Sequence, residues 1–230
     1  MSLFSYNNME EASQALAQRI CTAARQAMAW SSAFSLVLSG GSSPARLYQL
    51  LSEPTYADRL DWQHIHLFWG DERCVAPDHP HSNFLLAKER LLDHISMPAA
   101  NIHRMPGEMR PEDGATSYQD DIRKFFAGAE VKFDFILLGL GSDGHTASLF
   151  PGTAGLQEME RDVIDVPAPL AMKPQVARLT LSLPAINRAR EICFLSAARG
   201  KENVLKKITS GQGHQYPAAM VAEPDWYLAG

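Results

Sequence analysis

Short apolar runs, each followed by a polar or glycine-rich loop and then by helical periodicity, most constrain how this chain can fold. The clearest runs are Phe34–Leu38, Ile65–Trp69, Phe133–Leu138 and Ile192–Leu195, and Val163–Val166 and Leu179–Leu183 are shorter candidates. Strands that are apolar along their length and alternate with helices are typical of a mostly parallel sheet covered on both faces. We therefore predict an α/β fold with helices on both sides of the sheet.

The predicted helices follow from apolar spacing and from capping residues. Residues Met9–Trp30 carry apolar side chains every three or four positions, which indicates an amphipathic helix with one buried stripe. A second helix is predicted over Ala45–Leu51, with Ser43 as N-cap and Pro44 at the first helical position. Further helices are expected at about Asn83–Asp93, capped by Ser82, at Glu112–Phe126 and near Lys201–Thr209.

Composition sets the class of protein and excludes several partners. The chain has 230 residues and a net charge of −5, with no basic cluster, which argues against nucleic-acid or anionic-membrane binding. We predict one domain over residues 1–230, because the most linker-like stretch, Pro167–Pro174, is short. The three cysteines lie far apart and no signal peptide or membrane-length apolar run is evident, so we expect a cytoplasmic protein without disulfides.

Three loops follow predicted strands, and ligands of open α/β sheets collect at the carboxyl ends of the strands. The first loop is Ser39-Gly40-Gly41-Ser42-Ser43-Pro44. Its small residues would let backbone amides approach an anion at the start of the next helix. Taken alone, it fits equally well a tight turn with no ligand, and it lacks the Gly-Lys-Ser/Thr ending of a Walker loop.

The second loop begins with Gly70-Asp71-Glu72-Arg73. These charges could hold a substrate or orient a catalytic group, although a solvated charge cluster is the simpler interpretation. The same loop contains Asp78, His79 and His81, but no further motif with the spacing of a zinc site accompanies them. We therefore predict no metal.

The third loop contains Gly139-x-Gly141-x-x-Gly144, which matches a dinucleotide-binding fingerprint. Pro151 and Gly152 interrupt the long helix that the fingerprint requires, so we predict no nicotinamide cofactor. Asp143 and His145 instead place a carboxylate two residues before an imidazole. A free imidazole titrates near pH 6.5, so His145 is a candidate general base with Asp143 fixing its tautomer.

Two further cations stand at strand and helix ends. Arg178 begins the segment RLTLSL, and Lys201 follows Gly200 at the start of the last predicted helix. Each could meet an anionic substrate group, but a strand-end arginine and a solvated lysine are equally ordinary.

The segments LSGGSSP, FWGDERCV, HSNF, LLGLGSDGHTASLFPG, RLTLSLPAIN and GKEN occur in order from Leu38 to Lys201. Together they resemble the glucosamine-6-phosphate isomerase/6-phosphogluconolactonase family, on its lactonase branch. The resemblance implies a Rossmann-like three-layer fold and hydrolysis of 6-phospho-D-glucono-1,5-lactone in the oxidative pentose phosphate pathway, with no metal or cofactor. It implies His145 as general base, Asp143 orienting it and Arg73 stabilising developing negative charge. The phosphate would be held by the loop residues Gly40, Gly41, Ser42 and Ser43, together with Arg178 and Lys201.

Two rival functions remain open on the sequence. The deaminase branch of the family resembles this chain at Asp143-Gly144-His145, but it typically follows with Asn-Glu-Pro where this chain has Leu149-Phe150-Pro151. Phenylalanine has no acid–base chemistry, which counts against that branch. A sugar-phosphate sensor would need a DNA-binding segment, for which we see no basic helix. The expected partner is a small sugar-phosphate lactone, and the expected assembly is a monomer or a weak homo-oligomer.

Overall fold

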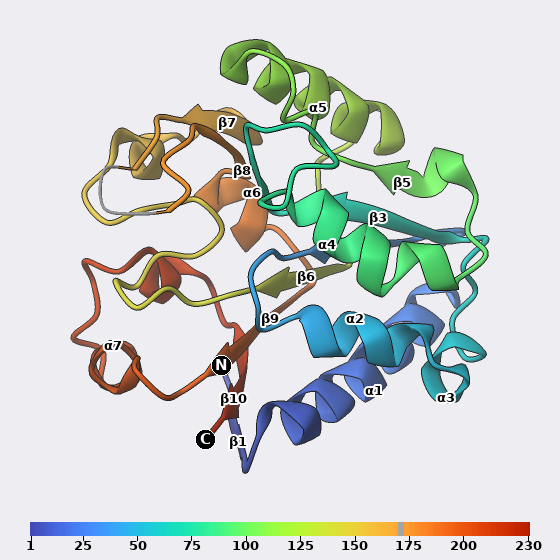
Figure 1. Ribbon diagram of the computed structural model, residues 1–230, viewed down its shortest axis with the longest axis horizontal. Helices are drawn as coiled ribbons and strands as arrows, with labels where there is room; N and C mark the ends of the chain where they lie inside the picture. Colours follow the sequence, from blue (N-terminus) through green and yellow to red (C-terminus); the bar gives the residue numbers. More distant parts are fainter. Residues whose placement is uncertain (170–172) are drawn as a thin grey trace.

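The computed structural model describes residues 1–169 and 173–230, and its centre is a sheet of seven strands (Figure 1). All neighbouring strands in this sheet are parallel, which confirms the prediction of a mostly parallel sheet. Their spatial order is β1 (Leu3–Tyr6), β10 (Asp225–Ala229), β9 (Glu191–Ala197), β6 (Phe135–Leu138), β2 (Phe34–Leu38), β3 (Ile65–Trp69) and β5 (Ile102–His103).

Helices flank this sheet in a three-layer arrangement, as the resemblance implied (Figure 1). Helix α1 packs against β9, β10 and α2, whereas α5 packs against the strand β5 at the other edge. The longer helices are α1 (Met9–Ala27), α2 (Ala45–Ser52), α4 (Asn83–Arg90), α5 (Pro111–Phe125) and α7 (Glu202–Thr209), and the short ones are α3 (Pro54–Ala57) and α6 (Leu183–Asn187).

The strand order reverses between β2 and β6. From β2 the chain proceeds outward through β3 to β5, and from β6 it proceeds in the other direction through β9 to β10. At such a reversal the loops after the two central strands diverge and leave a crevice at the carboxyl edge of the sheet. This topology therefore positions the first and third predicted loops, which follow β2 and β6, on the two sides of one opening.

A second sheet of three antiparallel strands was not predicted. It contains β4 (Asp71–Arg73), β8 (Arg178–Leu181) and β7 (Val163–Val166) in this order, and α5 packs on it. The segment Asp71–Arg73, which we expected to be part of a loop, forms its edge strand. Because β4 is only three residues long and pairs with a strand more than a hundred residues away, local periodicity does not reveal it.

Several element boundaries differ from the sequence prediction. Ser43 does not cap α2: Pro44 occupies the N-cap position, and no side-chain hydrogen bond caps this helix. Ser82 does cap α4, as predicted, by accepting a hydrogen bond from the amide of Leu85. The strand predicted to reach Leu183 ends at Leu181, since Ser182 caps the short helix α6. The linker-like stretch Pro167–Pro174 includes residues 170–172, which lie outside the described residues.

Candidate active site

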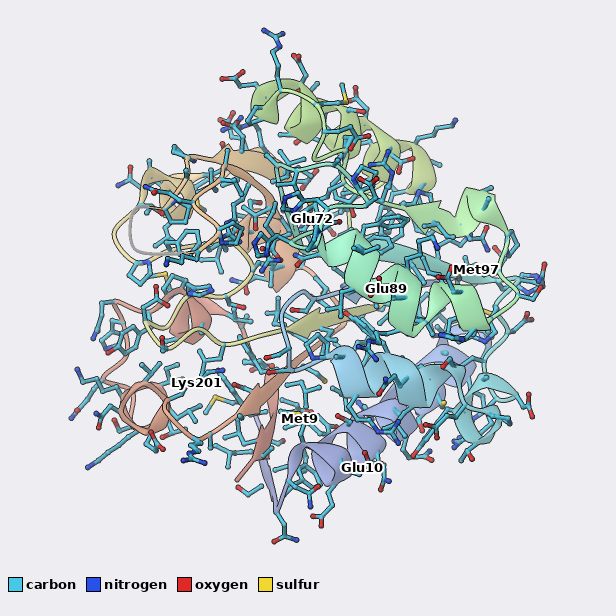
Figure 2. All side chains as sticks on the ribbon, viewed as in Figure 1. Met9, Glu10, Glu72, Glu89, Met97 and Lys201 are labelled. Carbon is cyan, nitrogen blue, oxygen red and sulfur yellow. The ribbon has the colours of Figure 1, made fainter. Side chains whose placement is uncertain are left out.

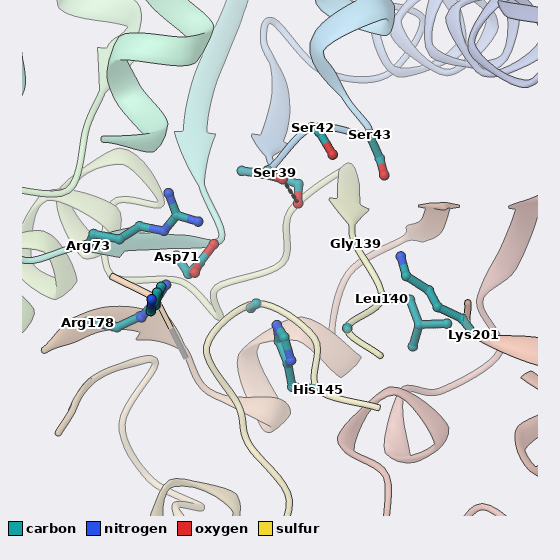
Figure 3. A pocket seen from close by; sticks show the side chains of 15 residues that line it. Ser39, Ser42, Ser43, Asp71, Arg73, Gly139, Leu140, His145, Arg178 and Lys201 are labelled. Atoms are coloured by element: carbon teal, nitrogen blue, oxygen red, sulfur yellow. Dashed lines mark hydrogen bonds between the residues drawn. The ribbon is translucent and has the colours of Figure 1, made fainter. Parts of the chain in front are cut away.

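The carboxyl ends of β2 and β6 in the large sheet, together with strands β4 and β8 of the small sheet, surround a cavity of about 220 Å³ (Figure 3). It is lined by the loops after β2 and β6, by the two ends of the β4–β8 pair and by the start of α7. The lining residues are Ser39, Gly40, Gly41, Ser42, Ser43, Asp71, Arg73, Gly139, Leu140, Gly141, His145, Ala147, Lys173, Arg178 and Lys201. All the residues predicted for the site line it except Asp143, which contacts His145.

The loop after β2 depends on glycine at two positions. Gly41 has a φ of +86°, in the left-handed region that favours glycine. A Cβ on Gly40 would lie 1.9 Å from Oδ1 of Asn83, so only glycine leaves room for that side chain. The loop thus keeps its backbone and the hydroxyls of Ser42 and Ser43 at the cavity wall (Figure 3).

Glu72 is buried and caps α4, so the GDER segment is not a solvated charge cluster (Figure 2). Its carboxylate accepts hydrogen bonds from the amides of Arg73, Asn83 and Phe84 and from the hydroxyl of Ser82. Burial raises the pKa of Glu72, although these hydrogen bonds oppose that shift. Because its oxygens accept these hydrogen bonds, Glu72 holds β4 to the start of α4 and is not available to a substrate.

Asp71 is also buried but lines the cavity. One carboxylate oxygen accepts a hydrogen bond of 2.6 Å from the hydroxyl of Ser148, and the other accepts one of 3.1 Å from the side-chain amide of Asn83. Asp71 therefore ties β4 to the loop that carries His145 and to α4. Asp71 was predicted only as one of the charges that could hold a substrate or orient a catalytic group, and Ser148 was missed, since their pairing joins positions 77 residues apart.

Arg73 and Arg178 lie opposite each other in the β4–β8 pair. Arg178 is buried, and its guanidinium donates a hydrogen bond to the carbonyl of Pro174, while that of Arg73 donates to the carbonyl of His81. Within residues 1–169 and 173–230 neither forms an ion pair with a carboxylate, and Nε of each is buried without a hydrogen-bond partner. Burial lowers the pKa of Arg178, although Asp71 favours its charge. Two cations without a matching carboxylate partner favour an anionic ligand.

His145 is hydrogen bonded through Nδ1 to Oδ1 of Asp143, 2.5 Å away. Burial alone would raise the pKa of Asp143, but the hydrogen bonds and charge of His145 outweigh it and hold that pKa below its usual value. The ring of Phe150 lies 4.9 Å from the imidazole, centroid to centroid. A Cβ on Gly141 would lie 2.0 Å from Nδ1 of His145, so Gly141 makes the pair's position possible.

Lys201 lies on the far side of His145 from Arg73 and Arg178 (Figure 3). Its ammonium group donates a hydrogen bond of 2.7 Å to the hydroxyl of the buried Ser196 on β9. Burial lowers the pKa of Lys201. The cavity therefore has a cation at each side, with the imidazole between them.

Two further sequence motifs are the glycine fingerprint after β6 and the histidine pair in the loop after β4. The Gly139–Gly144 segment leads into a turn and an isolated bridge between Thr146 and Leu149, not into the helix that a dinucleotide fingerprint requires. His79 and His81 stack with ring centroids 5.3 Å apart, and the described residues contain no cluster of three or more His, Cys, Asp or Glu side chains arranged to hold a metal ion. Among those residues, no helix combines the length and the apolar character that crossing a membrane requires.

Comparisons with known proteins agree with the resemblance. The family model of glucosamine-6-phosphate isomerases/6-phosphogluconolactonases matches residues 7–227. A 6-phosphogluconolactonase of Synechocystis sp. is 43% identical over 192 residues, covering 81% of this chain and 76% of that protein. The crystal structure of 6-phosphogluconolactonase from Thermotoga maritima has a TM-score of 0.87 at 25% identity, covering 100% of this chain and 99% of that one.

A monomeric glucosamine-6-phosphate deaminase has a TM-score of 0.84 at 19% identity, covering 100% of this chain and 97% of that one, which shows a shared fold alone. The matched span of the family model covers almost the whole chain, including every segment that surrounds the cavity. This chain belongs to the glucosamine-6-phosphate isomerase/6-phosphogluconolactonase family.

Proposed function

We propose that this protein is a 6-phosphogluconolactonase, which hydrolyses 6-phospho-D-glucono-1,5-lactone to 6-phosphogluconate in the oxidative pentose phosphate pathway. The observation that carries the proposal is the His145–Asp143 pair at the wall of a cavity with cations on both sides. A lactone is an activated ester, so a positioned base and a stabiliser of negative charge are sufficient for its hydrolysis. A general base contributes about 10²–10⁴-fold and one oxyanion donor about 10²–10³-fold.

His145 is the base in this mechanism. When the imidazole is neutral, the proton on Nδ1 is donated to Asp143, which leaves a lone pair on Nε2. Nε2 takes a proton from water while the water oxygen bonds to the lactone carbonyl carbon. The tetrahedral intermediate then collapses by breaking the bond to the ring oxygen, and the imidazolium returns its proton to that oxygen. The carboxylic acid that remains loses its own proton to water.

Arg73 stabilises the negative charge that develops on the carbonyl oxygen. Its guanidinium is anchored by the hydrogen bond from Nη1 to the carbonyl of His81, which leaves Nη2 to donate to an anion. Its preorganised position matters because a donor that does not have to move stabilises the transition state more than the ground state.

The phosphate ligands in this proposal are the Gly40–Ser43 loop, Lys201 and Arg178, all of which line the cavity. Small residues expose the amides of the loop, and α2 begins directly after it, so its N-terminal end adds favourable potential for an anion. Arg178 lies beside Arg73, so it approaches the substrate from the small sheet.

The decisive experiment measures hydrolysis of freshly prepared 6-phosphogluconolactone by the purified protein, against the spontaneous background. Ammonia release from glucosamine 6-phosphate is measured in parallel. We expect fast lactone hydrolysis that survives exhaustive chelation, with no ammonia release. Ammonia release without lactone hydrolysis would assign the chain to deaminase chemistry, and activity lost on chelation and restored by one divalent ion would overturn the metal-free mechanism.

A further inference from the structure

Two buried tyrosines hold the ends of the two adjacent strands β2 and β3, and neither lines the cavity. Tyr48 lies on α2 and Tyr118 on α5, with 0% and 1% of their surface exposed. The hydroxyl of Tyr48 contacts the backbone of Ser39, which directly follows β2. The hydroxyl of Tyr118 contacts the backbone of Trp69, the last residue of β3. A hydroxyl can donate one hydrogen bond and accept others, so one tyrosine can satisfy both polar groups of one residue.

Tyr48 makes this double contact with Ser39. The amide of Ser39 donates to the tyrosine oxygen over 2.9 Å, and the hydroxyl donates to the carbonyl of Ser39 over 2.5 Å. The pairing of β2 with β6 extends only to Val37 and Ile136, because the two strands diverge at the crevice. The hydroxyl thus takes the place of a neighbouring strand at the point where the Ser39–Ser43 loop begins.

Tyr118 makes the same contact with Trp69. The amide of Trp69 donates to the tyrosine oxygen over 2.9 Å, and the hydroxyl donates to the carbonyl of Trp69 over 3.1 Å. The pairing of β3 with β5 ends one residue earlier, at Phe68 and His103. Gly70 follows Trp69 and leads directly into β4, which carries Asp71 and Arg73.

We propose that Tyr48 and Tyr118 are positioning residues for two different halves of the reaction. Tyr48 fixes the backbone of the loop that binds the phosphate. Tyr118 fixes the end of β3, and thereby the position of β4, which places Arg73 at the reacting carbonyl. The assignment rests on the proposed function, because it takes from it which loop meets the phosphate and which meets the carbonyl.

The chemistry of the contact predicts distinct effects for the two hydroxyls. Replacing either tyrosine by phenylalanine keeps the ring in the core and removes one oxygen, which leaves an amide and a carbonyl unpaired at a strand end. A loop that binds the phosphate in both the ground state and the transition state contributes mainly to KM. A side chain that meets charge developing only in the transition state contributes mainly to kcat.

The test compares Tyr48→Phe and Tyr118→Phe on 6-phosphogluconolactone and on unphosphorylated glucono-1,5-lactone. We expect Tyr48→Phe to raise KM about tenfold on the phosphorylated lactone and to leave kcat/KM on the unphosphorylated lactone close to wild type. Tyr118→Phe should lower kcat about tenfold on both lactones with little change in KM. The control is Tyr56→Phe on α3, whose hydroxyl makes only an exposed contact of 3.4 Å with the carbonyl of Gln14, and it should change neither constant.

Equal losses for both variants on both substrates would overturn the proposal and leave only a general effect on stability. Failure of the wild-type protein to hydrolyse the phosphorylated lactone would instead overturn the proposed function. Hydrogen exchange in the wild-type protein needs no variant and covers the case in which Tyr48→Phe does not fold. The amides of Ser39 and Trp69 should exchange far more slowly than those of Gly41–Ser43, and exchange as fast as in that loop would show that the tyrosine contacts do not persist.

Discussion

The two sheets of this protein contribute to one cavity by different means. The large parallel sheet supplies mostly small residues and backbone, through the loops Ser39–Ser43 and Gly139–Gly141 that follow β2 and β6. The small antiparallel sheet supplies charged side chains, namely Asp71, Arg73 and Arg178. The large sheet therefore mainly fixes the shape of the site, although Lys201 follows its strand β9, whereas the small sheet supplies both of the lining arginines.

Close packing fixes the positions of the loops that the large sheet contributes to the cavity. The spaces where Cβ atoms of Gly40 and Gly141 would lie are filled by the side chains of Asn83 and His145. The small sheet instead places two arginines opposite each other near two buried carboxylates, of which only Asp71 lines the cavity. A substitution at Gly40 or Gly141 should therefore act through the geometry of the site, whereas one at Arg73 or Arg178 should act through the guanidinium that meets an anion.

The largest effect is expected for His145→Asn, which removes the group between the two sheets. Asparagine is polar and of similar reach, but it cannot accept a proton at neutral pH. We expect kcat to fall by about 10²-fold or more, with nearly unchanged binding of 6-phosphogluconate, measured by steady-state kinetics and calorimetry. In the wild-type protein the rate should fall on the acidic side, as the base becomes protonated, and the variant should lose this limb.

The matched control is His64→Asn. His64 also pairs through Nδ1 with an aspartate, Asp61, at 2.7 Å, but it is exposed and does not line the cavity. This variant should keep wild-type kinetics. A His145→Asn protein with wild-type turnover and an unchanged pH profile would make His145 structural.

The next largest effect is expected for Arg73→Lys in the small sheet. Lysine keeps the positive charge but loses the planar fork of donors, so we expect kcat to fall about tenfold, less than for His145→Asn. The loss should be the same on phosphorylated and unphosphorylated lactone. Arg178→Lys is the comparison within the same pair of strands, and its loss should be confined to the phosphorylated substrate. The reverse pattern would exchange the roles of the two arginines.

The large sheet was predictable because its information is local. The apolar residues of Phe34–Leu38 and Ile65–Trp69 correctly predicted two strands. The position of Ser82 before a helical segment correctly predicted that it caps α4. In the small sheet, β7 and most of β8 were predicted as strands, whereas β4 was not, because all three of its residues are acidic or basic and such residues normally indicate a loop. Its pairing with β8 is determined by tertiary contacts that leave no period in the sequence.

The candidate site follows the same division. The loop residues and His145 could be identified from glycine spacing and from the motifs of the family, since these are short continuous segments. The hydrogen bonds of Asp71 with Ser148 and of Tyr118 with Trp69 join residues far apart in the chain, so nothing in the sequence alone indicates them. Glu72 illustrates the opposite error. The simpler interpretation of its motif was a solvated charge cluster, whereas its carboxylate is buried and caps α4.

A smaller effect is expected for Lys201→Met on the large-sheet side. Methionine preserves the apolar stem and removes the ammonium group that hydrogen bonds Ser196. We expect KM for 6-phosphogluconolactone to rise about tenfold with little change in kcat, and no change on the unphosphorylated lactone. Lys206→Met, an exposed position on the same helix, is the control and should behave as wild type. A loss on both substrates would place Lys201 at the carbonyl and weaken the division between the two sides.

The smallest effect concerns stability at low pH. It distinguishes the loss of fold stability in acid from the loss of activity when the catalytic base is protonated. His66 on β3 is partly buried, with Nδ1 3.0 Å from Nε2 of His103, whose Nδ1 is 2.9 Å from a carboxylate oxygen of Asp121. Burial, reinforced by the positive charges of His103 and His64, lowers the pKa of His66 to about 4. The unfolded chain has an ordinary histidine pKa of about 6.5, so between about pH 6.5 and 4 it binds more protons at this position than the native state does.

The contribution of His66 to stability should therefore fall as the pH decreases through this window. His66→Gln keeps a hydrogen-bonding side chain and cannot titrate there, so its Tm should depend less on pH between about 6.5 and 4 than that of the wild-type protein. We expect a difference of a few degrees, about 1 kcal/mol, measured by calorimetry at half-unit steps of pH. The acidic limb of kcat should be unchanged in this variant, because His66 does not line the cavity. Parallel Tm profiles for the two proteins would show that another group controls the acid sensitivity of the fold.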